Sequence, residues 1–284
     1  MHIVFLDYFR PMHFSRIALL ALFVFSLGIS GCNGYNKLLK SRDLELKYEK
    51  ALEYYYAGKY YKAYPLIEEL AAIYRGQKRS EKLFYLYAYC DYYLEDYLLA
   101  AYRFDEFTKT FPTSKYTEEC AFMEAMCQYK MSPIYELDQT HSYQAMSSLQ
   151  LFVDRYPQSP RLDSANMLVR ELELKIERKN YEGANQYMRM MDYRAAVIAY
   201  ENLLEAFPDT KLREEVMFKM FKSKYLLSQK SVEEKKLERI DDAMKAYVTF
   251  VDQFPGSLFV KEAETYYIAL DKARKDYIVE NDEF

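Results

Sequence analysis

One pattern of residue types recurs along most of the chain and limits what it can fold into. A small residue is followed at the fourth position by a bulky apolar residue, at the seventh by another, and at the twelfth by proline. It occurs as Ala100/Phe104/Phe107/Pro112, Ala145/Leu149/Phe152/Pro157, Ala196/Tyr200/Leu203/Pro208 and Ala243/Tyr247/Phe250/Pro255. Positions i, i+4 and i+7 share one face of a helix, and proline stops a helix. Each copy therefore predicts a helix that buries one stripe of side chains and then ends.

A weaker first copy, Ala63/Ile67/Leu70, has Arg75 in place of the proline. Gly76 follows it, and a glycine in the left-handed conformation ends a helix equally well. We therefore expect five such helices.

Each of these helices is preceded by another apolar-periodic segment of about four turns. These segments are Leu46–Ala57, Lys82–Leu94, Tyr116–Lys130, Arg178–Met190 and Val216–Leu227. Small residues occupy the positions where paired helices would cross, at Ala51, Ala88, Ala125 and Ala184. Only 7 Gly and 8 Pro in 284 residues disfavour a many-stranded sheet. The predicted fold is all-α, an α-solenoid of about five helical hairpins that resemble tetratricopeptide repeats.

The repeats are irregular. The loop Met131–Tyr143, an extended helix over Arg161–Lys179 and the charged segment Ser228–Asp242 lengthen the later copies. The prolines near residue 157 are the best boundary between rigid halves, so we expect repeat-containing halves at residues 44–157 and 158–284.

The first 31 residues have the composition of a signal peptide. Arg10 and Arg16 precede the apolar run Ile17–Leu27, which is too short for the about 20 residues of a transmembrane helix. Met12 is an alternative start. Ile29-Ser-Gly-Cys32 resembles the lipobox of bacterial lipoproteins, which implies cleavage after Gly31 and a diacylglycerol on Cys32. Residues 32–43 would then be a lipidated linker. Asn33, where an Asp would retain the protein at the inner membrane, implies the periplasmic face of the outer membrane.

The residues give little support for catalysis. Without the leader, His141 is the one remaining histidine, and no metal-ligating or nucleophile motif is present. We therefore expect no enzyme activity, no cofactor and no metal. The charge balance, 39 Lys+Arg against 43 Asp+Glu, disfavours nucleic acid as a partner. Cys90, Cys120 and Cys127 are expected to be buried free thiols.

Tyrosine is unusually abundant, with 31 copies and no Trp, and roughly half of the tyrosines lie between Tyr48 and Tyr102. In tetratricopeptide repeats the first helices line the concave groove. The register of the predicted first helices places Tyr, Leu, Phe and Met side chains in this groove. The candidate partner-binding residues are Tyr48, Tyr55, Tyr56, Tyr85, Tyr89, Tyr92 and Tyr129. Tyrosine offers a large apolar area and a hydrogen-bonding hydroxyl to an extended peptide. The alternative is that these rings pack between hairpins.

The lipobox, the segment Tyr35–Ser41 and the five hairpins together resemble the BamD (YfiO) family of outer membrane protein assembly factors. Phe111-Pro-Thr-Ser114, Tyr156-Pro-Gln-Ser159 and Phe207-Pro-Asp-Thr210 look like the turns of that family, and Ser132–Asp138 looks like its third-repeat insertion. The resemblance implies a scaffold of the β-barrel assembly machinery. Its N-terminal hairpins would receive the targeting strands of unfolded outer-membrane proteins, and its C-terminal half would dock a BamA-like barrel protein alongside other subunits of the machinery.

Two other classes remain as alternatives. A periplasmic tetratricopeptide adaptor of the CpoB/YbgF type shares the turns, although such adaptors usually carry an N-terminal coiled coil and no lipid anchor. A SusD-like glycan-binding lipoprotein also contains such repeats, but sugar-binding platforms favour Trp, which this chain lacks.

Overall fold

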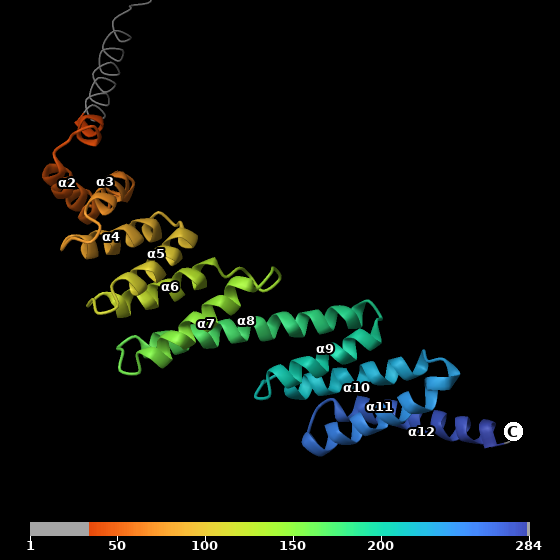
Figure 1. Cartoon of the computed structure of the whole chain (residues 1–284). Helices are drawn as coiled ribbons and strands as arrows, with labels where there is room; N and C mark the ends of the chain where they lie inside the picture. Colours follow the sequence, from red (N-terminus) through yellow and green to blue (C-terminus); the bar gives the residue numbers. More distant parts are fainter. Residues whose placement is uncertain (1–33, 283–284) are drawn as a thin grey trace, which may run out of the picture. The chain divides into compact units, whose positions relative to one another are not determined.

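The computed structural model describes residues 34–282, which are helical with short connections and contain no strand. Helix contacts divide this part of the chain into two compact units, residues 34–131 (unit 1) and residues 132–282 (unit 2), and Figure 1 shows their helices. The leader and Cys32 lie outside the described residues. The prediction of an all-α, repeat-built fold is confirmed.

Unit 1 begins with helical residues 34–39. It continues with α2 (Leu44–Tyr56), α3 (Tyr60–Ile73), α4 (Ser80–Tyr93), α5 (Tyr97–Thr110) and α6 (Thr117–Met131). Unit 2 contains α7 (Thr140–Arg155), α8 (Leu162–Arg189), α9 (Tyr193–Ala206), α10 (Arg213–Gln229), α11 (Glu233–Gln253) and α12 (Val260–Asp282). Within each unit every helix packs against the next one along the chain. This is the packing of a solenoid, in which each repeat covers the apolar face of its neighbour.

Four helices end at an aromatic residue followed by proline, as the repeated pattern predicts. The helix-ending residues Phe111, Tyr156, Phe207 and Phe254 have φ between −124° and −133°. This backbone conformation lies outside the helical region, as expected before a proline, whose ring disfavours the helical conformation of the preceding residue. Three positions after each aromatic residue, a Ser or Thr hydroxyl accepts a hydrogen bond from the backbone N–H two residues further on, at 3.0–3.1 Å. The first copy ends instead at Gly76, whose φ is +79°.

The repeated small and bulky residues form the core. Ala63, Ala100, Ala145, Ala196 and Ala243 are fully buried, and so are Ala51, Ala88, Ala125 and Ala184 on the preceding helices. The bulky positions are buried with them, except for the half-buried Tyr247. The three cysteines are also buried and free, as expected. Burial raises the pKa of Cys90 and of Cys127 to about 12, so these thiols stay protonated at neutral pH.

Three features differ from the expectations. The segments expected as an extended helix and as the first helix of the fourth hairpin form one continuous helix, α8. The helices expected as the third hairpin, α6 and α7, belong to different units, where α6 packs on α5 and α7 packs on α8. Helix α12 was not expected, and it covers the end of the unit 2 core with the buried residues Ala263 and Leu270.

The units divide at residue 131, earlier than the prolines near residue 157 suggest. The reason is that the loop over residues 132–139 is bound to unit 2. Lys179 of α8 donates hydrogen bonds to three backbone carbonyls of this loop, the shortest at 2.8 Å to Leu137. Lys175 donates to the Ser132 hydroxyl at 2.8 Å.

Candidate functional site

The tyrosines of unit 1 form a continuous set of ring contacts between α2, α3, α4, α5 and the start of α6. We call this set the tyrosine cluster and define it as Tyr55, Tyr56, Tyr60, Tyr85, Tyr89, Tyr92, Tyr93, Tyr97 and Tyr116. Two of its contacts are parallel stacks, Tyr60 on Tyr93 at 4.4 Å between ring centroids and Tyr85 on Tyr116 at 4.3 Å. Because each ring touches the next, the cluster joins side chains from four helices, α2 to α5, and from Tyr116 in the turn just before α6.

The cluster has a buried part and an exposed part. Tyr89 is 8% exposed and packs edge-on against Phe104, at 5.1 Å between centroids. Tyr56 is 68% exposed and Tyr93 is 46% exposed. The half-buried rings of Tyr55 and Tyr60 connect the two parts. The arrangement therefore presents two large rings to solvent on a base of rings that are packed.

A carboxylate of α6 orders the buried part of the cluster. The Tyr85 hydroxyl donates a hydrogen bond to Glu119 Oε1 at 3.1 Å, and the Tyr89 hydroxyl donates to the same oxygen. Burial, together with Glu119, raises the pKa of both phenols above the ordinary value for tyrosine. Burial likewise raises the pKa of Tyr55 and of Tyr92. The phenols are consequently neutral at physiological pH and act as hydrogen-bond donors.

The structure places the seven tyrosines predicted to bind a partner in three kinds of environment. Tyr56 is well exposed, whereas Tyr55, Tyr85 and Tyr92 are half-buried, and all four belong to the cluster together with the buried Tyr89. The sixth, Tyr48, is half-buried on α2 outside the cluster, with the Arg79 guanidinium 4.7 Å from its ring centroid. The seventh, Tyr129, is half-buried on α6.

Sequence reasoning did not identify Tyr116 and Glu119 as parts of this site. Tyr116 closes the chain of rings at Tyr85, and Glu119 anchors two hydroxyls. A signal for Glu119 does exist in the sequence. Tyr85 and Glu119 are 34 residues apart, and the same separation joins Tyr181 of α8 to Glu215 of α10, where the hydroxyl donates at 2.6 Å. Equivalent positions of successive repeats therefore carry the same Tyr–Glu link.

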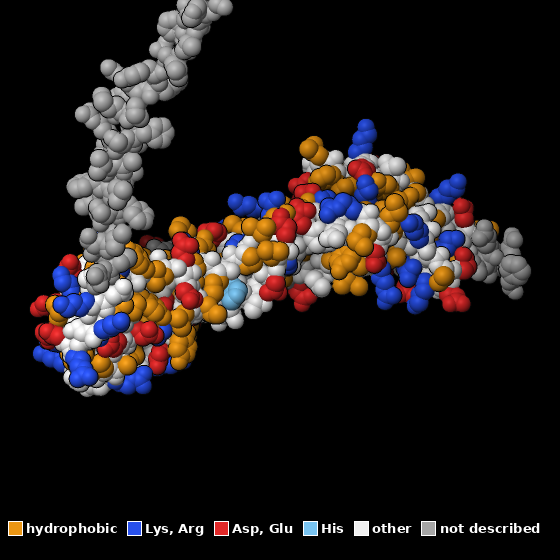
Figure 2. All heavy atoms as spheres, turned by 90° about the horizontal axis from the view of Figure 1, so that it is seen from above, with side chains coloured by type: hydrophobic (Ala, Val, Ile, Leu, Met, Phe, Trp, Pro, Cys, Tyr) orange, Lys and Arg blue, Asp and Glu red, His pale blue; other side chains and the backbone are white. Residues whose placement is uncertain are grey.

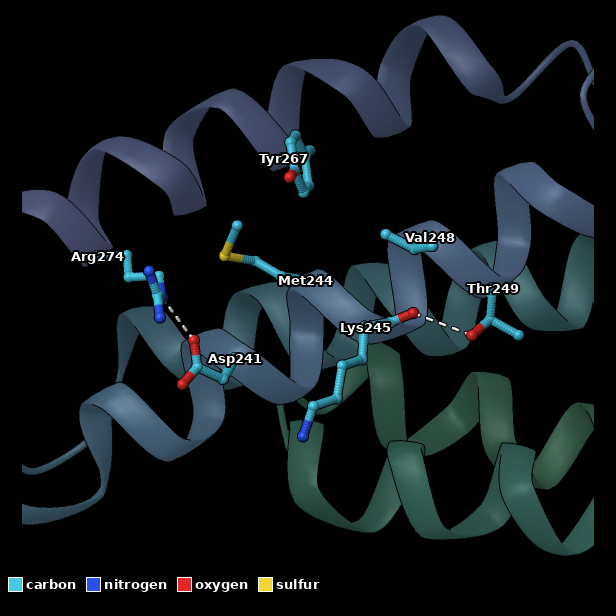
Figure 3. A pocket seen from close by; sticks show the side chains of 7 residues that line it. All are labelled: Asp241, Met244, Lys245, Val248, Thr249, Tyr267 and Arg274. Atoms are coloured by element: carbon cyan, nitrogen blue, oxygen red, sulfur yellow. Dashed lines mark hydrogen bonds and ion pairs between the residues drawn. The ribbon is translucent and has the colours of Figure 1, made fainter.

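A second candidate surface lies in unit 2, between α11 and α12. Its shallow pocket has a volume of about 560 Å³. Figure 3 shows the side chains that line it, Asp241, Met244, Lys245, Val248, Thr249, Tyr267 and Arg274. The Arg274 guanidinium bonds to Asp241 Oδ1 at 2.7 Å and closes one end. Tyr267 stacks on Tyr247 at 4.4 Å, and Val248 is 48% exposed. This surface combines apolar contact area with an ion pair at its edge, the composition of a protein-binding surface.

Other kinds of site are not found in the described residues. Within residues 34–282, no helix combines the length and apolar composition needed to cross a bilayer. The same part of the chain contains no group of three or more His, Cys, Asp or Glu placed to hold a metal ion. Hydrophobic side chains, orange in Figure 2, do reach the surface of both units.

Comparison with known proteins agrees with this architecture. The chain matches the family described as outer membrane lipoprotein (YfiO) over residues 41–240, from just before α2 into α11. It is 20% identical over 205 residues to the outer membrane protein assembly factor BamD of Caulobacter vibrioides, and the alignment covers 71% of this chain and 67% of that protein. The family match spans more than half of the chain. The chain belongs to the YfiO (BamD) family of outer membrane lipoproteins.

Proposed function

We propose that this protein is a lipid-anchored scaffold for outer membrane protein assembly. The C. vibrioides relative is named for that role, and Ile29-Ser-Gly-Cys32 supplies the lipidation signal. A diacylglycerol on Cys32 would hold the helical units at the periplasmic face of the outer membrane, since two acyl chains anchor a protein stably. The units themselves supply surfaces for partners, and in this proposal the protein acts by binding.

In this proposal the tyrosine cluster receives the targeting strand of unfolded outer-membrane proteins. The observation that carries it is the pair of exposed rings, Tyr56 and Tyr93, on packed neighbours. A ring that is already immobilised loses little side-chain entropy when it binds a peptide. Targeting strands commonly end in an aromatic residue, and such a residue would stack on these rings at a gain of about 0.5–1.5 kcal/mol per pair beyond its area burial.

The test is a titration of the mature chain with a synthetic, fluorescently labelled C-terminal strand of an outer-membrane barrel. We expect Tyr56→Ala and Tyr93→Ala to weaken binding by about 1 kcal/mol or more each, as truncation of interface aromatics does. Tyr102→Ala is the matched control, because Tyr102 is 60% exposed on α5 of the same unit and is not part of the cluster.

The melting temperature separates binding from packing. Because Tyr56 and Tyr93 are exposed, their truncation should lower it only slightly. Equal affinity of all three variants and the wild type would show that the strand does not bind at the cluster. A large loss of stability in Tyr56→Ala and Tyr93→Ala would show that these two rings serve the core.

The BamA-like barrel protein is proposed to dock on unit 2, at the surface between α11 and α12. That surface offers the exposed Val248 next to Met244 and Tyr267, with Lys245 and Asp241 at its rim. An apolar centre with a charged rim is the usual organisation of a protein interface. Helix α12 covers the unit 2 core with Ala263 and Leu270. Its Tyr267 and Arg274 form one wall of this surface, which stays open to solvent.

A further inference from the structure

Besides the pocket of unit 2, a second hollow lies in unit 1, where the described chain begins. It measures about 980 Å³ and is lined by Gly34, Asn36, Lys37, Leu38, Lys40, Ser41, Leu46, Lys50 and Tyr54. Residues 34–39 and helix α2, which Figure 1 shows at the start of unit 1, provide its walls. We call it the N-terminal groove. The described residues that line it supply apolar side chains, with Leu46 40% exposed, and three lysines but no carboxylate.

The surroundings of the groove are basic although the whole chain is acidic. Residues 34–62 carry seven basic side chains against four acidic ones; Lys47 is buried and paired with Glu69 outside this segment, which leaves a net charge of +2, whereas the whole chain has −4. The seven are Lys37, Lys40, Arg42, Lys47, Lys50, Lys59 and Lys62, and the four are Asp43, Glu45, Glu49 and Glu53.

Several of the acidic groups are already engaged. Glu45 pairs with Arg79 at 2.6 Å, Glu53 pairs with Lys50 at 2.6 Å, and the Asp43 side chain caps α2. Lys37 and Lys40 are exposed and line the groove without a carboxylate in its wall. They are therefore the lysines best placed to bind an external anion.

Only a short stretch of chain separates the groove from Cys32, the proposed lipidation residue. Gly34 lines it and is two residues after Cys32, and two residues span at most about 7 Å. This distance is shorter than the Debye length of about 8 Å at physiological ionic strength. If Cys32 is acylated, Gly34 lies within the electrostatic field of the membrane surface, and Lys37 and Lys40 follow it by three and six residues.

We infer that the N-terminal groove binds the headgroups of anionic phospholipids in the membrane that holds the lipid anchor. Lys37 and Lys40 pair with the phosphate, and Leu46 and Tyr54 contact the glycerol and upper acyl region. The groove thereby orients unit 1 on the membrane surface, which a flexible acyl anchor alone would not do. The inference rests on the proposed lipidation of Cys32 for its biological setting, but the binding site is formed by residues 34–54.

The test uses the mature chain, residues 32–284, with Cys32→Ser so that it carries no acyl chain; it retains every residue that the structure describes. Sedimentation measures its binding to vesicles of phosphatidylcholine alone and of an equal mixture with phosphatidylglycerol. We expect binding to the anionic vesicles only, and its loss in 1 M salt, where the Debye length is about 3 Å. Lys37→Gln/Lys40→Gln should weaken it about 30-fold, since each lysine near an anionic surface contributes about 1 kcal/mol and 1.4 kcal/mol is tenfold.

The matched control is Lys78→Gln/Lys211→Gln, which removes the same charge at exposed positions outside the groove. It should bind as the unsubstituted chain does. Equal weakening in both double variants, or equal binding to both kinds of vesicle, would overturn the inference.

Fatty-acid labelling of the full chain, compared with Cys32→Ala, tests the anchor separately. Lack of labelling would refute the lipidation of Cys32 while leaving the vesicle result unchanged, so the two failures are distinguishable.

Discussion

The turn before α9 holds a methionine in the left-handed region of backbone conformation. Met191 has φ of 61°, and the corresponding positions before α3 and α5 are Gly58 with φ of 70° and Glu95 with φ of 65°. The three turns share one geometry, and in two of them the following Asp caps the next helix: Asp96 accepts from Leu99 N–H and Asp192 from Ala195 N–H. Glycine adopts this conformation without the steric cost that a Cβ imposes.

We therefore expect Met191→Gly to stabilise unit 2, by about 0.5–1 kcal/mol. Met190 is the matched control, because it is equally exposed but has φ of −76°. Met190→Gly should lower the free energy of unfolding, since glycine in an ordinary helical conformation loses more entropy on folding. Urea unfolding of both variants measures the effect. Destabilisation by both substitutions would show that the contacts of the Met191 side chain add more to the free energy of unfolding than the left-handed backbone conformation takes away.

A buried ion pair in unit 1 gives the protein a pH dependence. Asp91 of α4 is 2% exposed and bonds to the Arg103 guanidinium of α5 at 2.5 Å. Arg103 also lies over the Tyr87 ring, 3.6 Å from its centroid. Burial raises the pKa of Asp91 from its ordinary value of 3.8 to about 6, although Arg103 acts in the opposite direction. The folded chain thus holds a proton on Asp91 more tightly than the unfolded chain does.

The sign of the pH effect follows from this difference. Between about pH 4 and pH 6 the folded state binds more protons at Asp91, so its contribution to the free energy of unfolding falls as the pH rises through that range. Asp91→Asn cannot titrate. The stability of the wild type relative to Asp91→Asn should therefore decline from pH 4 to pH 6 in thermal unfolding curves. A relative stability that rises over this range would mean that Arg103 keeps the carboxylate ionised.

At the scale of elements, links between equivalent positions of neighbouring repeats hold the first helices together. Glu119 of α6 accepts from Tyr85 and Tyr89 of α4, and Glu215 of α10 accepts from Tyr181 of α8. At the adjacent turns, the Ser114 hydroxyl donates to Glu81 at 2.6 Å and the Thr210 hydroxyl donates to Glu177. Apart from the link between Tyr89 and Glu119, which bridges 30 residues, these links bridge 33 or 34 residues, close to the period of a tetratricopeptide repeat.

Glu119→Ala should destabilise unit 1 by about 1–3 kcal/mol, because it leaves the buried Tyr89 hydroxyl without its acceptor. Glu119→Gln is the control, since its side-chain carbonyl can still accept a hydrogen bond. It should cost clearly less in urea unfolding. Equal losses for Ala and Gln would indicate that the charge of Glu119, and not the hydrogen bond, is what stabilises the contact between α4 and α6.

The repeated residue pattern predicted the ends of four helices because each of these helices is followed by its own stop signal. Phe111, Tyr156, Phe207 and Phe254 precede prolines, and the structure ends a helix at each. The continuity of α8 was not predictable in the same way, since residues 162–189 contain no proline and local pattern alone does not separate one long helix from two. Helix α12 has no closing proline and was missed.

For the candidate site, the sequence predicted the tyrosine-rich helices but not the exposure of each ring. Tyr89 and Tyr93 are four residues apart on α4, and one is 8% exposed whereas the other is 46% exposed. Which face of α4 is covered depends on α5 and α6, and those contacts are not local in sequence. Lys47 is a further residue whose exposure the sequence did not predict. It is 2% exposed and bonded to both oxygens of Glu69, whereas a lysine in a helix is normally solvated.

At the scale of the whole molecule, four features have complementary roles in the proposed function. The lipidated Cys32 and the N-terminal groove would attach the chain to the membrane, the tyrosine cluster of unit 1 would hold a targeting strand, and the surface between α11 and α12 of unit 2 would bind the barrel protein. Each of the two described units carries one of the proposed partner surfaces. A scaffold of this kind acts by bringing bound partners to the same place, which raises their effective concentration.

The most direct test of this account is affinity purification of the full chain from detergent-solubilised outer membranes. We predict that a BamA-like barrel protein co-purifies with it, and that Val248→Glu in the surface between α11 and α12 abolishes the association. Ile268→Glu, at an exposed position of α12 outside that surface, should leave it intact. Recovery of the folded, membrane-bound chain without any barrel protein would contradict a role in barrel assembly.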